Sequence, residues 1–140
     1  MPDVFSKKKR SEVMSKIRYK DTKIELKLRE AIRNSGLRGY RFNYKLIGKP
    51  DIVFNKYKVA IFCDGEFWHG KYYTKNKHKY KKYWIEKIKY NMKRDKRNNR
   101  KLREAGWSVL RVWEKDIEKN MTKCIRKIKL KLKERGYPKL

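Results

Sequence analysis

The sequence predicts a single α/β domain in which a central mixed sheet of about four strands is flanked by helices. Three observations predict this class. Apolar residues recur at helical spacing in three segments and at strand spacing in four others, and the two kinds of segment are interspersed along the chain. The 140 residues, 39% of them hydrophobic, suffice to bury one core and leave no room for a second domain.

A basic arm at residues 1–20 precedes the domain, which we assign to residues 21–140. The arm contains seven lysines and arginines, and its second half has few strong apolar residues, Met14 and Ile17 among them. Such a segment buries too little apolar surface to fold alone, so we expect it to order on a partner.

The first helix is predicted over residues 21–35. Asp21 and Thr22 are suitable N-caps, and Gly36 is a suitable residue to end the helix. The apolar residues that recur every four positions are Ile24, Leu28 and Ile32. Residues 40–46 then alternate between apolar and polar, which predicts a half-buried strand. Its apolar face would contain Tyr40, Phe42, Tyr44 and Leu46.

A hairpin is predicted from residues 51–54 and 58–63, which flank a short polar turn. If the chain turns at Lys56 and Tyr57, opposed residues have numbers that sum to about 113. Asp51 would then lie diagonally close to Asp64, so the two carboxylates would meet at one end of the sheet.

Residues 80–105 contain no proline or glycine, which predicts a long basic helix. The residues that share one of its faces are Trp84, Ile88, Asn91, Asp95 and Leu102. Residues 107–113 are predicted to return as a strand, and residues 122–135 to close the chain as a helix. The apolar face of that last helix would contain Ile125, Ile128 and Leu132.

The charge of the chain points to a polyanionic partner. Its 43 basic and 15 acidic residues give a formal net charge of +28, and nucleic acid is the leading candidate. The alternative is a basic protein of the membrane surface, but the longest apolar run, Val59–Cys63, has five residues and cannot span a bilayer. The amino terminus resembles neither a signal peptide nor an anchor, so we expect a cytoplasmic protein in which Cys63 and Cys124 are reduced.

Acidic residues are scarce in the middle of the chain. Between Ala31 and Ile85 they are only Asp51, Asp64 and Glu66. Like charges about 4 Å apart repel by roughly 4 kcal/mol at an effective dielectric constant near 20, so such a cluster needs a cation or raised pKa values. Mg²⁺ takes carboxylate and phosphate oxygens and suits a site that meets DNA. Alternatively, the acids pair with lysines at a strand end.

The acidic residues are followed by Phe67, Trp68 and His69, whose side chains are suited to a nuclease. His69 would be able to move protons near neutral pH, although a single histidine is also often structural. Phe67 and Trp68, if exposed, would stack on bases or wedge between them; otherwise they belong to the core. The chain lacks a phosphate-binding glycine loop, a nucleophilic serine elbow and a Cys-x-x-Cys motif, so a hydrolase here would use a metal and water.

The chain resembles the very short patch repair (Vsr) endonucleases over most of its length. The matching segments are RSEVMSKIRYKDTKIE (Arg10–Glu25), GKPDIVF (Gly48–Phe54), FCDGEFWHG (Phe62–Gly70), YWIEKIKYNMKRDKRN (Tyr83–Asn98) and LREAGWSVLRVWE (Leu102–Glu114). The resemblance implies a single restriction-endonuclease-like domain. It also implies Mg²⁺-dependent nicking of one strand of duplex DNA beside a T:G mismatch left by deamination of 5-methylcytosine, with DNA repair proteins as candidate partners.

The resemblance also assigns roles to residues. It makes Asp51 the metal-binding aspartate, the backbone carbonyl of Cys63 a second ligand, and His69 the proton-transfer group. Asp95 would support the histidine from the long helix, and Glu25 is the acid from the first helix. The apolar wedges at the mismatch would be Met14, Phe67 and Trp68. Further DNA contacts are expected from the arm and the long helix, at Lys16, Arg18, Lys87, Asn91 and Arg94.

Two departures from the family pattern concern the metal site. Asp64 stands where the family's best-known form has histidine, and Glu66 stands where it has a zinc-binding cysteine. The other zinc positions are occupied by Lys71, Tyr73 and Lys115. We therefore expect no structural zinc and a more carboxylate-rich catalytic site, with Mg²⁺ on Asp51 and Asp64. Glu66 would bind metal, activate water or point away.

Two alternatives to this function stay open. One is another nuclease of the same fold, either a restriction-type or homing-type enzyme or a repair nuclease for a different lesion. The other is a basic DNA-binding protein without catalysis. Cleavage assays on a panel of matched and mismatched duplexes distinguish them.

Overall fold

The computed structural model describes residues 23–65, 82–138 and 140. In chain order its elements are α2 (Lys23–Asn34), β1 (Tyr40–Phe42), β2 (Ile52–Phe54), β3 (Val59–Asp64), α4 (Lys82–Glu104), β4 (Ser108–Trp113), α5 (Glu114–Lys119) and α6 (Met121–Glu134). The basic arm and the FWHG motif lie outside the described residues.

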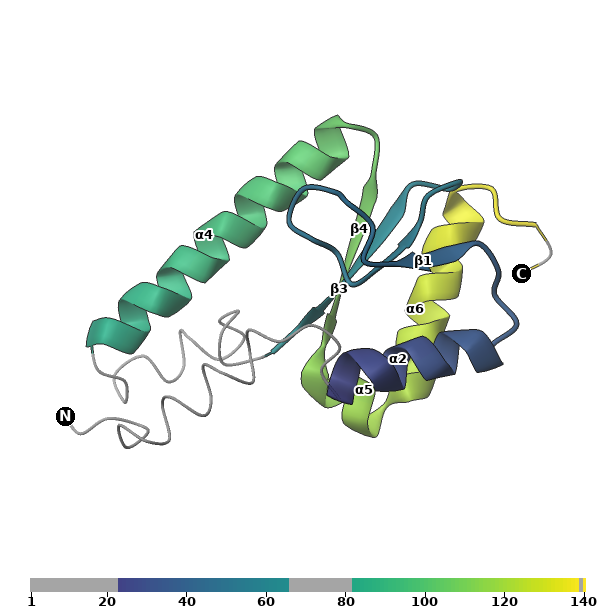
Figure 1. The fold of residues 1–140 in the computed structure, drawn as a ribbon, viewed down its shortest axis with the longest axis horizontal. Helices are drawn as coiled ribbons and strands as arrows, with labels where there is room; N and C mark the ends of the chain where they lie inside the picture. The colour runs from purple at the N-terminus through teal and green to yellow at the C-terminus, as the bar shows by residue number, and fades with distance from the viewer. Residues whose placement is uncertain (1–22, 66–81, 139) are drawn as a thin grey trace.

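The four strands form one mixed sheet in the order β1-β2-β3-β4. β2 is antiparallel to both of its neighbours, β1 and β3, whereas β4 pairs with β3 in parallel. A parallel neighbour requires a crossover connection, and α4 lies within that connection. Figure 1 shows α4 on one side of the sheet and the helices α2, α5 and α6 on the other. The predicted fold class is confirmed.

The sheet separates two clusters of buried side chains. The larger cluster joins β2, β3 and β4 to α2, α5 and α6, through side chains such as Phe54, Ile61, Leu28, Ile117 and Ile128. The smaller cluster contains Val53, Ala60, Phe62 and Leu102, the last from α4. Alternate residues of β3 therefore enter opposite clusters, as expected for a strand covered on both faces.

The hairpin of β2 and β3 has the predicted register. Ile52 pairs with Ile61 and Phe54 pairs with Val59, so each pair of numbers sums to 113. One residue beyond the strand, the backbone N–H of Asp51 donates to the carbonyl of Ile61 at 2.9 Å. Asp51 is therefore fixed to the edge of the sheet by the backbone itself.

The strand predicted over residues 40–46 ends early, at Phe42. Asn43 has a φ of 56°, in the left-handed region, which interrupts the alternation of an extended strand. Tyr40 and Phe42 consequently pack against the larger cluster, whereas Tyr44 and Leu46 pack against the smaller one. The prediction that all four share one face is wrong for this reason.

The later elements agree with the sequence, with one addition. The buried residues of α4 are the five predicted for its inner face: Trp84, Ile88, Asn91, Asp95 and Leu102. The predicted strand and last helix correspond to β4 and α6, and the short helix α5 between them was not predicted. Cys63 and Cys124 are both free, as expected. Within residues 23–65 and 82–138, no helix is long and apolar enough to cross a membrane.

Candidate active site at the end of the sheet

Asp51 is held at the start of β2 by its side chain as well as its backbone. Its Oδ2 atom accepts a hydrogen bond of 2.6 Å from the backbone N–H of Cys63, near the end of β3. The hairpin register makes this contact possible, because it brings the residue before β2 opposite the end of β3. The direction of the Asp51 carboxylate is therefore set by the sheet.

The surroundings of Asp51 disfavour its charged form. Its pKa is raised from 3.8 to about 7, and burial is the largest cause. Glu25 also raises it through its charge and a side-chain hydrogen bond, and Asp64 through its charge, whereas the Cys63 N–H bond lowers it. A neighbouring cation would reverse these effects, because it favours the ionised carboxylate.

Glu25 reaches Asp51 from the first turn of α2. Its Oε2 atom lies 3.9 Å from a guanidinium nitrogen of Arg29, one helical turn further along. Arg29 is itself buried, with its guanidinium 4.5 Å from the centre of the Phe42 ring. An acid from the helix and an acid from the sheet therefore meet, and the helical one is oriented by an arginine.

Asp64 ends β3 on the side of the sheet that faces α4. Both of its carboxylate oxygens accept hydrogen bonds from Nη1 of Arg111, at 3.0 and 3.1 Å. Arg111 comes from β4, where it is the register partner of Phe62. Asp64 therefore follows the alternative of pairing with a basic residue, although its partner is an arginine of the neighbouring strand and not a lysine.

Asp95 joins the same group from α4. Its Oδ1 atom lies 3.6 Å from Nη1 of Arg111 and 3.5 Å from Nη2 of Arg94. Asn91, one turn earlier on the helix, is buried with 8% exposure, whereas Arg94 and Lys87 are partly exposed. Arg94 and Lys87 therefore present more of their side chains to solvent than Asn91 does.

The structure brings the predicted residues into two adjacent groups. Glu25, Asp51 and the backbone of Cys63 form one, and Asp64 and Asp95 form the other through Arg111. The charge of Asp64 acts on Asp51, which links the two groups. The predicted residues outside the described ranges are Met14, Lys16, Arg18, Glu66, Phe67, Trp68 and His69, together with the former zinc positions 71 and 73.

The donors available for a metal ion here are oxygens. Among the described residues, no three or more His, Cys, Asp and Glu side chains converge as a metal-binding group. Burial and the neighbouring acids raise the pKa of the Cys63 thiol, so it stays protonated and is a poor metal ligand. The remaining donors are the Glu25 and Asp51 carboxylates and the Cys63 carbonyl, which suit Mg²⁺ rather than zinc.

Arg111 was not singled out from the sequence, although a signal was present. It is a charged residue within the otherwise apolar segment WSVLRVW (107–113). A charge inside a strand next to the buried strand β3 requires a partner. That partner is Asp64, which lies two residues after Phe62 and therefore on the same face of β3.

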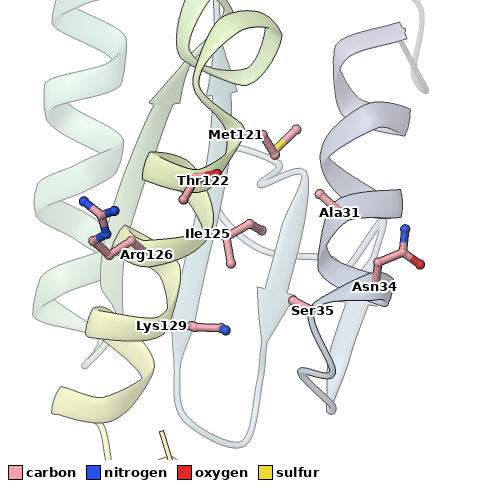
Figure 2. Close-up of a pocket in the computed structure, with 8 residues that line it drawn as sticks. All are labelled: Ala31, Asn34, Ser35, Met121, Thr122, Ile125, Arg126 and Lys129. Carbon is pink, nitrogen blue, oxygen red and sulfur yellow. The ribbon is translucent and has the colours of Figure 1, made fainter.

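A groove elsewhere on the surface has different chemistry. It has a volume of about 570 Å³ and lies between the C-terminal end of α2 and the first half of α6 (Figure 2). Its lining residues are Ala31, Asn34, Ser35, Met121, Thr122, Ile125, Arg126 and Lys129. None of them is an acid, and Glu25 lies at the other end of α2. The groove therefore offers no carboxylate to hold a metal ion.

The family model described as DNA mismatch endonuclease Vsr matches residues 2–75. The chain is 40% identical over 136 residues to the type II nicking enzyme V.NmeDIP of Neisseria meningitidis serogroup C, covering 95% of this chain and 92% of that protein. It is 43% identical over 119 residues to the type II nicking enzyme V.HpaIIP of Haemophilus parainfluenzae, covering 83% and 84%.

A third relative is the DNA mismatch endonuclease Vsr of Escherichia coli strain K12. It is 40% identical over 116 residues, which cover 81% of this chain and 74% of the relative. These matches confirm the resemblance seen in the sequence motifs. The chain therefore belongs to the Vsr family and is a DNA endonuclease.

Proposed function

We propose that this endonuclease nicks one strand of duplex DNA beside a T:G mismatch in a Mg²⁺-dependent reaction. Support comes from the family, whose model is described as a DNA mismatch endonuclease, and from relatives named as nicking enzymes. The observation that carries the metal part of the proposal is the partly buried pair of Asp51 and Glu25 beside the end of β3, where the charge of Glu25 disfavours the ionisation of Asp51.

The residues at this site fit a hard divalent cation. Asp51, the Cys63 carbonyl and Glu25, directly or through water, would hold it, since Mg²⁺ binds through one or two carboxylates and keeps several waters. When bound, Mg²⁺ supplies Lewis-acid polarisation of the scissile phosphate and a water of lowered pKa. The Cys63 N–H contributes by fixing the Asp51 carboxylate before any ligand arrives.

The proton transfers are assigned to His69, with Asp95 as the acid that orients it. Hydrolysis adds water to phosphorus and breaks one P–O bond, so one group must accept the proton of the water and the leaving oxygen must gain one. Asp64 was predicted as a metal ligand. Its double contact with Arg111 favours the role of a charge partner, and we propose that role instead.

We expect two kinds of contact with DNA: contacts that position the duplex and contacts that recognise the mismatch. Lys87 and Arg94 on α4, with Lys16 and Arg18 of the arm, would bind phosphates, which positions the duplex without reading its sequence. Met14, Phe67 and Trp68 would enter the stack at the mismatch, where deformation costs least. DNA repair proteins that process the nick are the expected partners.

The test is a nicking assay on a panel of labelled duplexes that differ at one base pair: matched, T:G and other mismatches. We expect Mg²⁺-dependent cleavage of one strand, fastest beside T:G. Cleavage that ignores the mismatch would favour a restriction-type enzyme, and preference for a different mispair would favour repair of another lesion. Cleavage absent on every duplex would overturn the proposed function.

The matched variants are Asp51→Asn and Asp116→Asn. The first removes a charge from the site and should lower the nicking rate by at least about 10³-fold, since a bound metal ion contributes several kcal/mol. The second makes the same chemical change in α5, where Asp116 lies 3.9 Å from Lys123, and should leave the rate unchanged. Equal losses in both variants would remove Asp51 from the metal site.

A further inference from the structure

We infer that Arg111 is a positioning residue for the nicking reaction: its guanidinium holds Asp64 and Asp95, which come from different elements, in fixed places beside Asp51. This inference rests on the proposed function, because it concerns the arrangement of acids around the proposed metal site. It assigns to Arg111 a role that acts through other residues rather than by contact with DNA.

The guanidinium of Arg111 links three elements. Nη1 donates to both oxygens of Asp64 at the end of β3, and it lies 3.6 Å from Oδ1 of Asp95 on α4. Nε donates to the side-chain oxygen of Asn99, one turn further along α4, at 2.9 Å. One side chain of β4 therefore fixes the middle of the long helix to the end of the neighbouring strand.

The link is rigid and largely dry. The side chains of Arg111 and Asp64 are 17% and 4% exposed, and the guanidinium lies 4.2 Å from the centre of the Phe62 ring. Stacking on an aromatic ring and several hydrogen bonds restrict the arginine to one orientation. Its low exposure also makes it a poor phosphate contact, unlike Arg94, whose side chain is 39% exposed.

A shift of the Arg111–Asp64 pair would alter the position of Asp51. Asp64 directly follows Cys63, whose N–H holds Oδ2 of Asp51. Loss of Arg111 leaves Asp64 buried without its cation, and Asp64 must then shift, take up a proton or bind another cation. Each response changes the end of β3, and a displacement of about 1 Å at a reacting site can cost about 10²-fold in rate.

This role differs from that of a metal ligand in what it predicts. If Asp64 binds the metal, its neutralisation should raise the Mg²⁺ concentration needed for half-maximal nicking. If Arg111 and Asp64 position the other acids, the rate at saturating Mg²⁺ and DNA should fall, while the KM for DNA and the Mg²⁺ requirement stay constant. The two roles are therefore separable by titration.

The experiment compares Arg111→Gln, Arg111→Lys and the double variant Asp64→Asn/Arg111→Gln on the duplex that the wild-type protein nicks fastest. Arg111→Gln should lower kcat by about 10-fold to 100-fold with KM unchanged. Arg111→Lys should fall between it and wild type, because lysine restores the charge without the fork of donors. The double variant buries no unpaired charge, which protects the test against a failure of Arg111→Gln to fold.

Arg135→Gln is the matched control. Arg135 also links two segments, through hydrogen bonds to the carbonyls of Tyr57 and Gly106, but it does so after the end of α6. Its replacement removes the same charge and two hydrogen bonds, at a place remote from the acids. Nicking by this variant should match that of the wild-type protein once urea unfolding shows both to be folded.

The outcomes separate the inference from the proposed function. A folded Arg111→Gln or double variant with wild-type kcat would overturn the positioning role, even though the wild-type protein nicks as proposed. So would a raised Mg²⁺ requirement with unchanged kcat at saturation, which would make Asp64 a ligand. Absence of nicking by the wild-type protein would overturn the proposed function and, with it, this inference.

Discussion

The acids of the candidate site differ in how their charges are compensated. Arg29 and Arg111 each lie over a phenylalanine ring and each pair with an acid, Glu25 in one case and Asp64 in the other. Asp51 is held by a backbone N–H and faces Glu25, so its charge is compensated less completely. The carboxylate with the raised pKa is therefore the one that would gain most from a cation.

The raised pKa of Asp51 predicts how stability depends on pH. Between its ordinary pKa of 3.8 and its folded value of about 7, the folded state binds more protons than the unfolded state. Stability should therefore be greatest below about pH 4 as far as this group is concerned, and fall as pH rises through 7, by at most about 1.4 kcal/mol per pH unit. Urea unfolding from pH 4 to 8 in a chelator measures this dependence.

Two additions sharpen that measurement. In Asp51→Asn the fall between pH 4 and 7 should diminish, because the group no longer titrates. Mg²⁺ should stabilise the wild-type protein more at pH 8 than at pH 5, since metal ligands must be deprotonated. A pH profile identical in the wild type and Asp51→Asn would show that this carboxyl titrates normally in the folded protein.

At the scale of single residues, sequence reasoning identified acids better than their partners. Asp51 and Asp64 stand out because acids are scarce in the middle of a chain of charge +28, and Asp95 through its place on the inner face of the long helix and the family resemblance. Which of the many basic residues meets each acid depends on register and helix placement, so Arg111 did not stand out. The excess of basic residues makes the acids easy to identify in the sequence, but it also makes the partner of each acid hard to identify.

At the scale of elements, prediction succeeded where two constraints agreed. The hairpin has a turn signal and two apolar runs, so its register followed from the sequence. The inner face of α4 followed from helical spacing, which also placed Asn91 and Asp95 inside. The segment 40–46 had alternation alone, and a single left-handed residue redirected its second half.

Asn43 therefore offers a test of how that redirection is stabilised. Asparagine tolerates the left-handed region and glycine adopts it freely, whereas a β-branched residue is strained there. Asn43→Gly should change the free energy of unfolding by no more than about 0.5 kcal/mol, and Asn43→Val should lower it by about 1–3 kcal/mol. Urea midpoints for the two variants measure the difference. Equal midpoints would indicate that the segment can continue as a strand.

At the scale of the whole molecule, a strongly basic protein contains a small cluster of acids at the end of its sheet. The net charge of +28 concentrates DNA at the surface, while the acids at the end of the sheet would repel a phosphate that approaches them directly. Arg111 offsets that repulsion locally, and the proposed metal ion would add to this effect. This division explains why composition alone predicts the partner, whereas the reaction depends on motifs from distant parts of the chain.

The same charge distribution predicts the salt dependence of binding. If 6 to 10 phosphates are contacted, affinity for duplex DNA should fall by about 10³-fold to 10⁵-fold between 50 and 200 mM salt. Removal of one phosphate contact should reduce the slope of log affinity against log salt by about 1.

We expect this reduction for Lys87→Gln on α4, and no such change for Lys127→Gln on α6, which lies across the sheet. Fluorescence anisotropy in a chelator measures both slopes. Equal losses would mean that DNA responds to the total charge, and that α4 has no particular place in the interface.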